Sequence, residues 1–385
     1  MSWPSIALLA LASRLGFYQW DGVGVRGNSE DLLTQARGHA TAAGGRVFRL
    51  YLGARFDYQR HPGSAPADAS VTPARLLALP HYRAVMEDPA LETIILTTYT
   101  ASNGDDLNLL RPWSENHDRL EREQIRELTD FLYEQFGSRP KTVIIANSEA
   151  DEKMLEIMNY TGSPERAVEN LTAWTRVRHQ AIEQARGRRP NARLRLRLLH
   201  GFEISLVNLA IAGHEGRFRK SPQGTWNALR NVVPKVRFDL LLYSTYESIN
   251  SPFETQNADT APQEAGRRLR RDLDRIRERS RASLSPTGRR LFGDRFVAAG
   301  ELGFARDRFE HLPSGGVLPR LMSSVQAAID WGCPYIVLWQ VFDAPRAGGE
   351  QYGFGLIDRN GRAPRLQPGP GGCDSIRSCV AGMVR

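Results

Sequence analysis

Two glutamates stand at the ends of apolar segments whose composition predicts buried β-strands. Glu149 closes the segment KTVIIANSE, and Glu301 lies near the end of RFVAAGELG. A carboxylate at the end of a buried strand is costly to desolvate unless it faces solvent or a partner. Two such residues in one chain are therefore candidates for an acid/base pair. If Glu149 were not the acid, Asp151 and Glu152 would be the nearest substitutes.

Eight short apolar segments alternate with stretches of helical periodicity, and this alternation predicts a single (β/α)₈ barrel over residues 1–365. A doubly wound open sheet is less favoured, because GVGVRG has the wrong glycine spacing for a phosphate loop after the first strand. Residues 366–385 are expected to form a C-terminal tail. The predicted strands are Gly16 to Trp20, Arg46 to Leu52, Thr93 to Tyr99, Lys141 to Asn147, Arg193 to His200, Phe238 to Thr245, Arg295 to Glu301 and Tyr335 to Val341. Five helices are predicted between them: Asp31 to Ala43, Arg119 to Phe136, Pro164 to Arg186, Ala265 to Arg281 and Pro319 to Trp331.

Active sites of such barrels lie at the C-terminal ends of the strands. Glu149 and Glu301 fall there, on the fourth and seventh predicted strands. Hydrolysis of a glycosidic bond needs two carboxyl groups, one that protonates the leaving oxygen and one that attacks the sugar or activates water. The positions of the two glutamates suit that chemistry.

Over residues 14 to 365 the chain resembles the clan A retaining glycoside hydrolases, the cellulase and mannanase type of (β/α)₈ enzyme, without a specific family. The matching segments are VFRLYL around Arg49, LLLYSTY with Tyr243 and Tyr246, YIVLWQVFD with Trp339, and the closing YGFGLIDRNGRAPR. The resemblance implies that Glu301 is the nucleophile, Glu149 the acid/base, and Arg49 the arginine beneath the nucleophile. It further implies that one of the two tyrosines donates a hydrogen bond to Glu301 and that Trp339 floors the first sugar subsite.

The expected electrostatics follow from these roles. Arg49 and a tyrosine donor would lower the pKa of Glu301, and burial beside a second carboxylate would keep Glu149 protonated near neutral pH. Further candidates for substrate contact are Asn147, His200 and Trp20. Glu203, which with His200 ends the fifth strand, is a candidate for lining the cleft. Ser148 separates Asn147 from Glu149, whereas the resembling enzymes have Asn directly before the acid/base. In a regular strand Asn147 and Glu149 would share one face, unless a bulge or bend at Ser148 changes the presentation.

Two alternatives remain open beside a hydrolase of oligo- or polysaccharides: a transglycosylase with the same pair, and a catalytically silent barrel that binds glycans. No cofactor is expected, and the scattered histidines and the cysteine spacing do not predict a metal site. The net charge of +8 comes largely from the stretch Ala265 to Arg281, an amphipathic helix with a basic face. A polyanion-binding surface is the alternative there, but no aromatic residues interleave these arginines, so nucleic acid is not an expected partner.

The apolar residues Ile6 to Ala12 are too few to span a bilayer, so membrane insertion is not expected. They allow two localisations: a secreted or periplasmic protein if they are the remnant of a signal peptide, and a cytoplasmic one if they form a first helix. Cys373 and Cys379 are candidates for a disulfide, although three cysteines and no CxxC leave the pairing open. The sequence also leaves the oligomeric state open.

Overall fold

A computed structural model describes most of the chain. The described residues are 13–20, 24–25, 27–53, 71–100, 107–189, 195–250, 261–310, 316–345, 351–353, 355–358, 360–366 and 373–384. The apolar N-terminal segment Ile6 to Ala12 therefore lies outside the described residues.

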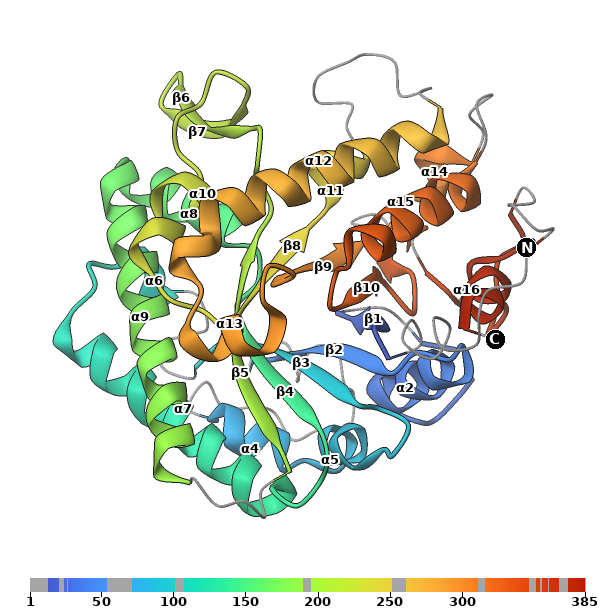
Figure 1. Cartoon of the computed structure of the whole chain (residues 1–385), viewed down its shortest axis with the longest axis horizontal. Helices are drawn as coiled ribbons and strands as arrows, with labels where there is room; N and C mark the ends of the chain where they lie inside the picture. Colours follow the sequence, from blue (N-terminus) through green and yellow to red (C-terminus); the bar gives the residue numbers. More distant parts are fainter. Residues whose placement is uncertain are drawn as a thin grey trace.

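Eight parallel strands close into a barrel with the order β1-β10-β9-β8-β5-β4-β3-β2, and helices surround it (Figure 1). This confirms the predicted single (β/α)₈ barrel, and each of the eight predicted strands has a counterpart. The strands are β1 Leu15–Gln19, β2 Val47–Leu52, β3 Thr93–Thr98, β4 Thr142–Ala146, β5 Arg197–Ile204, β8 Leu240–Ser244, β9 Val297–Leu302 and β10 Ile336–Trp339.

The barrel strands are buried on both sides, which explains why they are apolar without a simple alternation. One cluster of side chains fills the interior, with members such as Val47, Ile95, Leu199 and Leu242. A larger cluster packs between the strands and the helices. Along β5, residues Leu199, Gly201 and Glu203 face the interior and the residues between them face the helices, because successive side chains of a strand alternate.

The helical ring contains the five predicted helices, and it also contains helices that the sequence did not indicate clearly. Local capping explains several starts: Asp31 accepts a hydrogen bond from Thr34 N at 2.8 Å, and Ser163 accepts one from Arg166 N at 3.1 Å before Pro164. The predicted helices are α2 Leu32–Ala42, α7 Glu115–Phe136, α9 Pro164–Arg188, α12 Pro262–Ser280 and α15 Val317–Trp331; the others are α4 Pro73–Leu77, α5 Pro80–Glu87, α6 Leu107–Leu110, α8 Ala150–Thr161, α10 Ala228–Asn231, α11 Tyr246–Ile249, α13 Pro286–Phe292, α14 Arg306–Phe309 and α16 Ile376–Val384.

The connection between the fifth and sixth barrel strands contains an antiparallel hairpin, β6 Ala210–His214 and β7 Arg217–Ser221, which projects beyond the helical ring in Figure 1. The preceding strand β5 continues to Ile204, four residues past the predicted end at His200. Because of this extension, Glu203 and not His200 lies at the mouth end of the strand. A second, short antiparallel pair joins β11 Ala344–Pro345 to β12 Gln351–Tyr352.

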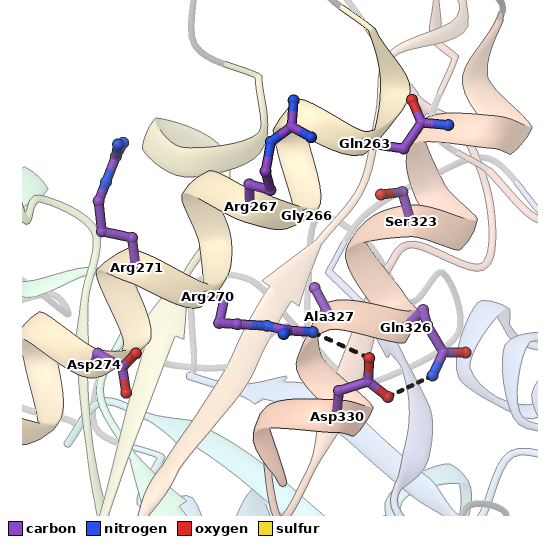
Figure 2. Close-up of a pocket in the computed structure, with 10 residues that line it drawn as sticks. All are labelled: Gln263, Gly266, Arg267, Arg270, Arg271, Asp274, Ser323, Gln326, Ala327 and Asp330. Atoms are coloured by element: carbon purple, nitrogen blue, oxygen red, sulfur yellow. Dashed lines mark hydrogen bonds and ion pairs between the residues drawn. The ribbon is translucent and has the colours of Figure 1, made fainter.

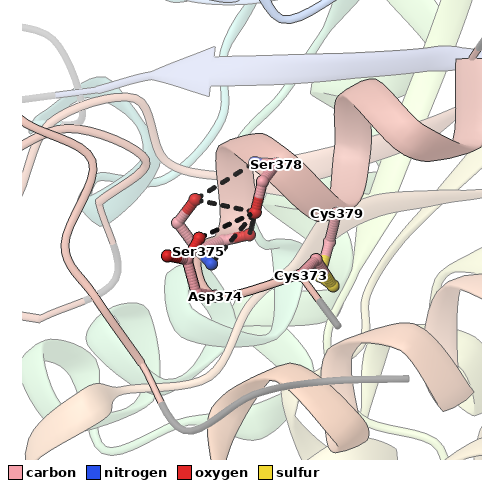
Figure 3. Close-up of a disulfide and its surroundings, with 5 residues drawn as sticks. All are labelled: Cys373, Asp374, Ser375, Ser378 and Cys379. Atoms are coloured by element: carbon pink, nitrogen blue, oxygen red, sulfur yellow. Dashed lines mark hydrogen bonds between the residues drawn. A yellow bond between two sulfur atoms is a disulfide. The ribbon is translucent and has the colours of Figure 1, made fainter. Parts of the chain in front are cut away.

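The C-terminal segment ends in α16, which contacts α15 (Figure 1). Cys373 and Cys379 form a disulfide at the start of this helix (Figure 3). Ser375 and Ser378 hydrogen-bond one another beside it, with a hydroxyl separation of 2.9 Å. Treating residues 366–385 as a separate tail remains a prediction. Within the described part of the chain, no helix has the length and apolarity needed to cross a bilayer.

Candidate functional site

Glu301 reaches the barrel interior because β9 contains a bulge. Between β8 and β9, Tyr243 pairs with Ala299 and Ser244 pairs with Glu301, so Gly300 has no opposite residue. On the other side, Ile336 pairs with Ala299 and Leu338 with Leu302, so three steps along β9 match two along β10. A bulge redirects the side chains that follow it. Strict alternation from the inward Ala298 would have turned Glu301 toward the helices.

Inside the barrel, Arg49 is shared by two carboxylates. Its Nη1 and Nη2 atoms donate to Oε1 and Oε2 of Glu203 at 2.5 and 2.6 Å, and both side chains have no exposed surface. Nη1 also lies 3.4 Å from Oε1 of Glu301 and donates to the carbonyl of Gly300 at 3.1 Å. The fully buried guanidinium packs over the ring of Tyr18, 4.3 Å from its centroid. A buried arginine requires such partners, because an unpaired buried charge is strongly destabilising.

Glu149 lies beyond the end of β4, at the N-cap position of α8. Its side chain is half-buried, and burial raises the pKa of Glu149 to about 7, with the carboxylates of Glu152 and Glu203 acting in the same direction. Lys220 of β7 opposes this shift, and it also forms an ion pair with Glu152. A carboxyl group with a pKa of about 7 can hold a proton at neutral pH, as a general acid must.

Glu301 is almost buried, with 6% of its surface exposed. Burial raises the pKa of Glu301 well above its usual value, the neighbouring Glu203 raises it further, and Arg49 lowers it. The sequence-based expectation that Arg49 would leave Glu301 with a lowered pKa is therefore wrong. Arg49 does lower the pKa of Glu301, but two effects outweigh it: burial, which is the larger, and the negative charge of Glu203, which both terminal nitrogens of Arg49 contact.

Aromatic residues lie around the mouth of the barrel next to these carboxylates. Trp339 ends β10 and is half-buried; its ring lies 4.9 Å from that of Tyr18 and 6.2 Å from that of Trp20. Trp20 is half-buried as well, and its backbone N–H donates to Gln340 at 3.2 Å. Exposed indole surface beside charged groups suits a sugar ring, which has an apolar face and polar edges.

Of the two candidate tyrosines, the structure brings Tyr246 to the site. Burial raises the pKa of Tyr246 well above its usual value, and the charges of Glu301, Glu149 and Glu203 raise it further, which places its phenol among the three carboxylates. Tyr243 points outward instead. Its hydroxyl lies 2.6 Å from that of Ser248, which donates to Asp272 of α12 at 2.6 Å. Since Leu242 faces the interior, alternation turns Tyr243 toward the helices.

The structure does not bring His200 to the carboxylates. Its ring lies in the outer layer, 5.3 Å from that of His179 on α9. Burial lowers the pKa of His200 well below 6.5, so the buried ring is neutral. The sequence-based placement of His200 at the barrel mouth came from ending the fifth strand at that residue, whereas the strand continues to Ile204.

Asn147 lies at the mouth, but its amide is occupied by the backbone. Its Oδ1 accepts from the N–H of Glu203 at 2.8 Å, and its Nδ2 donates to the carbonyls of Ser148 at 2.8 Å and Glu203 at 3.1 Å. The strand ends at Ala146, so the alternation expected for Asn147 and Glu149 does not apply. Asn147 instead ties the end of β4 to the backbone beside Glu203.

Glu203, which the sequence placed with His200 at the end of the fifth strand as a candidate for lining the cleft, is the buried ion-pair partner of Arg49. Ser244 of β8 accompanies it, with its hydroxyl 3.5 Å from Glu203 Oε1, and a side-chain hydrogen bond from Ser244 lowers the pKa of both Glu149 and Glu301. The sequence analysis did not predict the pairing of Glu203 with Arg49, although the continuation LLHGFEI after Arg197 carried a signal for it. Alternation from Leu199 through Gly201 would have placed Glu203 on the same inward face as Arg49.

The groove between α12 and α15 is a separate surface feature (Figure 2). It is lined by Gln263, Gly266, Arg267, Arg270, Arg271, Asp274, Ser323, Gln326, Ala327 and Asp330. Several of its charges are already paired: Arg267 with Glu264 at 2.7 Å and Arg270 with Asp330 at 3.0 Å. The helix itself matches the predicted amphipathic helix, with Leu269, Leu273 and Ile276 buried. Because neighbouring carboxylates already pair with these arginines, we interpret α12 as a helix with a solvated basic face and not as a polyanion-binding site.

The described residues contain no cluster of three or more histidine, cysteine, aspartate or glutamate side chains arranged to hold a metal ion. Of the three glutamates at the site, Glu203 and Glu301 are paired with Arg49. Glu203 and Glu301 are buried or almost buried and Glu149 is half-buried. The buried guanidinium of Arg49 lies between Glu203 and Glu301.

Comparison with known proteins identifies the fold. No protein-family model matches the chain, and no curated protein matches it by sequence. Solved structures do match: the exo-β-1,4-mannosidase Op5Man5 from Opitutaceae bacterium strain TAV5 has a TM-score of 0.57 at 16% identity, over 97% of this chain and 59% of that one. GH5_18 from Streptomyces cattleya, solved with Manβ1-4GlcNAc, has a TM-score of 0.58 at 14% identity, over 97% of this chain and 80% of that one.

A third structure, ZgEngAGH5_4 in complex with a cellotriose, has a TM-score of 0.53 at 13% identity, over 100% of this chain and 99% of that one. The chain therefore has the single (β/α)₈ barrel fold of these glycoside hydrolases. It spans 59% of the length of the mannosidase chain.

Proposed function

We propose that this protein is a retaining glycoside hydrolase, with Glu301 as the nucleophile and Glu149 as the acid/base. The observation that carries the proposal is the difference between the two carboxyl groups at the barrel mouth. Glu149 is half-buried and has a pKa of about 7, whereas Glu301 is almost buried and lies 3.4 Å from Arg49. Two carboxyl groups in different environments are what double displacement requires.

The first step would be attack by Glu301 on the anomeric carbon while Glu149 donates its proton to the leaving oxygen. The second step would be hydrolysis of the glycosyl-enzyme, with Glu149 now accepting the proton of the attacking water. Three carboxylates against one guanidinium make full ionisation of the site unfavourable, so a proton is retained at neutral pH. Glu149 has a pKa of about 7, so it can hold a proton at neutral pH, and it is the more exposed of the two carboxyl groups, so it can pass that proton to a leaving oxygen at the mouth; both properties support its role as the acid.

Neutral β-linked oligosaccharides are the proposed substrates. The half-buried indoles of Trp339 and Trp20 offer stacking surfaces next to the carboxylates. The fold neighbours named above include a mannosidase and an enzyme solved with a cellotriose, so β-mannosides and β-glucosides are the first compounds to test.

The test is hydrolysis of aryl β-glycosides, β-1,4-linked oligosaccharides and polysaccharides by the wild type, Glu301→Ala and Glu149→Ala, with azide as an external nucleophile. Glu123→Ala, on the exposed side of α7, is the control. We expect loss of activity in both site variants, by a factor of at least about 10³ for Glu301→Ala. Azide should rescue Glu301→Ala to a glycosyl azide of inverted configuration and Glu149→Ala to one of retained configuration.

Other outcomes would decide against the proposal. A wild type that cleaves nothing but binds glycans, with equal binding by both variants, would identify a silent glycan-binding barrel. Transfer to sugar acceptors in preference to water, with the same rescue pattern, would identify a transglycosylase instead of a hydrolase.

A further inference from the structure

We infer that Glu203 is a positioning residue: it binds both terminal nitrogens of Arg49 and restricts Arg49 to a single, longer contact with Glu301. This inference rests on the proposed role of Glu301. Its basis is the difference in contact length: Arg49 approaches Glu203 at 2.5 and 2.6 Å through two nitrogens, but approaches Glu301 at 3.4 Å through one. Bidentate pairing of a guanidinium with a carboxylate is stronger than a single contact.

The surroundings fix Glu203 in this position. The backbone N–H and the carbonyl of Glu203 are both held by the side-chain amide of Asn147, at 2.8 and 3.1 Å. Gly300 leaves the space that the carboxylate fills, because a Cβ at Gly300 would lie 3.0 Å from Glu203 Oε1. The Glu203 side chain has no exposed surface. It therefore acts through Arg49, and it does not touch a substrate at the mouth.

The guanidinium is held from its other sides too. Its Nε donates to the hydroxyl of Thr97 at 2.9 Å, and its Cζ lies 4.3 Å from the centroid of the Tyr18 ring. Arg49 consequently cannot turn toward Glu301 without giving up contacts with β1, β3 and β5. The pairing with Glu203 is built into the interior of the barrel, so it precedes any substrate.

The functional consequence concerns the proton on Glu301. Glu203 adds a negative charge near Glu301 and engages the cation that would otherwise stabilise the ionised form, and both effects raise the pKa of Glu301. Removing the charge of Glu203 should lower that pKa and free Arg49 to pair with Glu301. Among the described residues, the main charged and titratable groups that act on Glu301 come from several elements: Arg49 of β2, Glu203 of β5, Glu149 after β4, Tyr18 of β1, Tyr246 of α11 and, as a hydrogen-bond donor, Ser244 of β8.

The experiment compares the wild type with Glu203→Gln and with a matched control, Glu121→Gln. Glu121 and Arg178 form another buried pair, with Arg178 Nε donating to Glu121 at 2.5 Å between α7 and α9. Glu121 is not among the main groups that act on Glu301. Both variants therefore replace a buried, arginine-bound glutamate, but only one of them alters the surroundings of Glu301.

In Glu203→Gln, we expect the acidic limb of the kcat/KM profile to move at least about one unit to lower pH. We also expect kcat to fall about tenfold or more with little change in KM, since Glu203 does not contact substrate. Glu121→Gln should leave the acidic limb in place. An unchanged acidic limb in a folded Glu203→Gln variant would overturn the inference.

A second readout separates this inference from the proposed function. The titration of Glu301 can be followed by NMR in protein labelled with ¹³C at the glutamate carboxyl carbons, with Glu301→Gln assigning the signal. A shift to lower pH in Glu203→Gln supports the inference even if no glycan is cleaved, and an unshifted titration overturns it.

Glu203→Asp covers the case in which Glu203→Gln does not fold. Aspartate keeps the charge but is one methylene shorter, so it should lose one of the two contacts with Arg49. We expect a reduced kcat with an unchanged acidic limb, and a wild-type kcat in Glu203→Asp would contradict a positioning role.

Discussion

Glu301 faces the barrel interior because Gly300 is the unpaired residue of a bulge on β9. Two features of Gly300 make this possible. Its carbonyl accepts a hydrogen bond from Arg49 at 3.1 Å, and its missing side chain leaves room for Leu242 and Glu203, since a Cβ would lie 2.9 Å from Leu242 Cβ and 3.0 Å from Glu203 Oε1. The site thus depends on a residue without a side chain.

Gly300→Ala is expected to destabilise the fold by about 1–3 kcal/mol, because the added methyl group overpacks a closed interior. Activity should fall as well, since Leu242 or Glu203 must move. Urea unfolding would measure the first effect and kcat/KM the second. Gly38→Ala is the matched control: Gly38 lies within α2, its added Cβ meets nothing within 4 Å, and alanine there should stabilise the protein by about 0.5–1 kcal/mol. Equal stabilities of the two variants would contradict the bulge argument.

Asp151 is a structural carboxylate that lies two residues from Glu149. It is fully buried, and it accepts hydrogen bonds from the N–H groups of Ser205, Leu206 and Ala228 at 2.8, 3.0 and 2.7 Å. These contacts hold the connection that follows β5. The geometry leaves Asp151 no part in proton transfer, although the sequence made it a substitute for Glu149.

Asp151→Ala should therefore cost about 3 kcal/mol or more of unfolding free energy, since three buried donors lose their acceptor. Glu152→Ala, which removes a partly exposed ion pair with Lys220, should cost less than about 1 kcal/mol. Urea unfolding of both variants would measure the difference. An Asp151→Ala variant of wild-type stability with abolished activity would show that Asp151 acts in the chemistry.

The sequence predicted the barrel well, because the eight buried strands are apolar on both sides and need no tertiary information to be recognised. It also placed both glutamates at the mouth. It failed where the outcome depended on register. The bulge at Gly300, the extension of β5 to Ile204 and the outward direction of Tyr243 are each a matter of one or two residues along a strand, and the apolar pattern does not encode them. The contact of Arg49 with Glu301 was expected, but its pairing with Glu203 was missed for the same reason.

The charges of Lys220 and Glu152 should shift the pKa of Glu149 in opposite directions. The charge of Glu152 raises the pKa of Glu149, and that of Lys220 lowers it. The basic limb of the kcat/KM profile, which reports loss of the acid proton, should move to lower pH in Glu152→Gln and to higher pH in Lys220→Met. The double variant should lie between the two. Shifts of the same sign in both single variants would show that Lys220 and Glu152 do not act on Glu149 through their charges.

The stability of the protein should also depend on the proton of Glu149. The folded-state pKa is about 7 and the ordinary value is 4.5, so the folded state holds this proton more tightly than the unfolded state does. Below pH 4.5 Glu149 is protonated in both states, and its contribution to the free energy of unfolding is fully present. Between pH 4.5 and about 7 the unfolded state loses the proton first, and this stabilising contribution is lost. Glutamine carries no such proton, so Glu149→Gln should gain stability relative to the wild type as pH rises through this window.

Urea unfolding of both proteins at a series of pH values from below 4.5 to above 7 would measure this difference. The gap between the two unfolding free energies should be constant at the acidic end, widen through the window and become constant again above it. A gap that stays flat throughout would mean that Glu149 ionises normally in the folded protein. Glu149 would then be a poor proton donor at neutral pH, and the acid of the proposed reaction would have to be sought elsewhere.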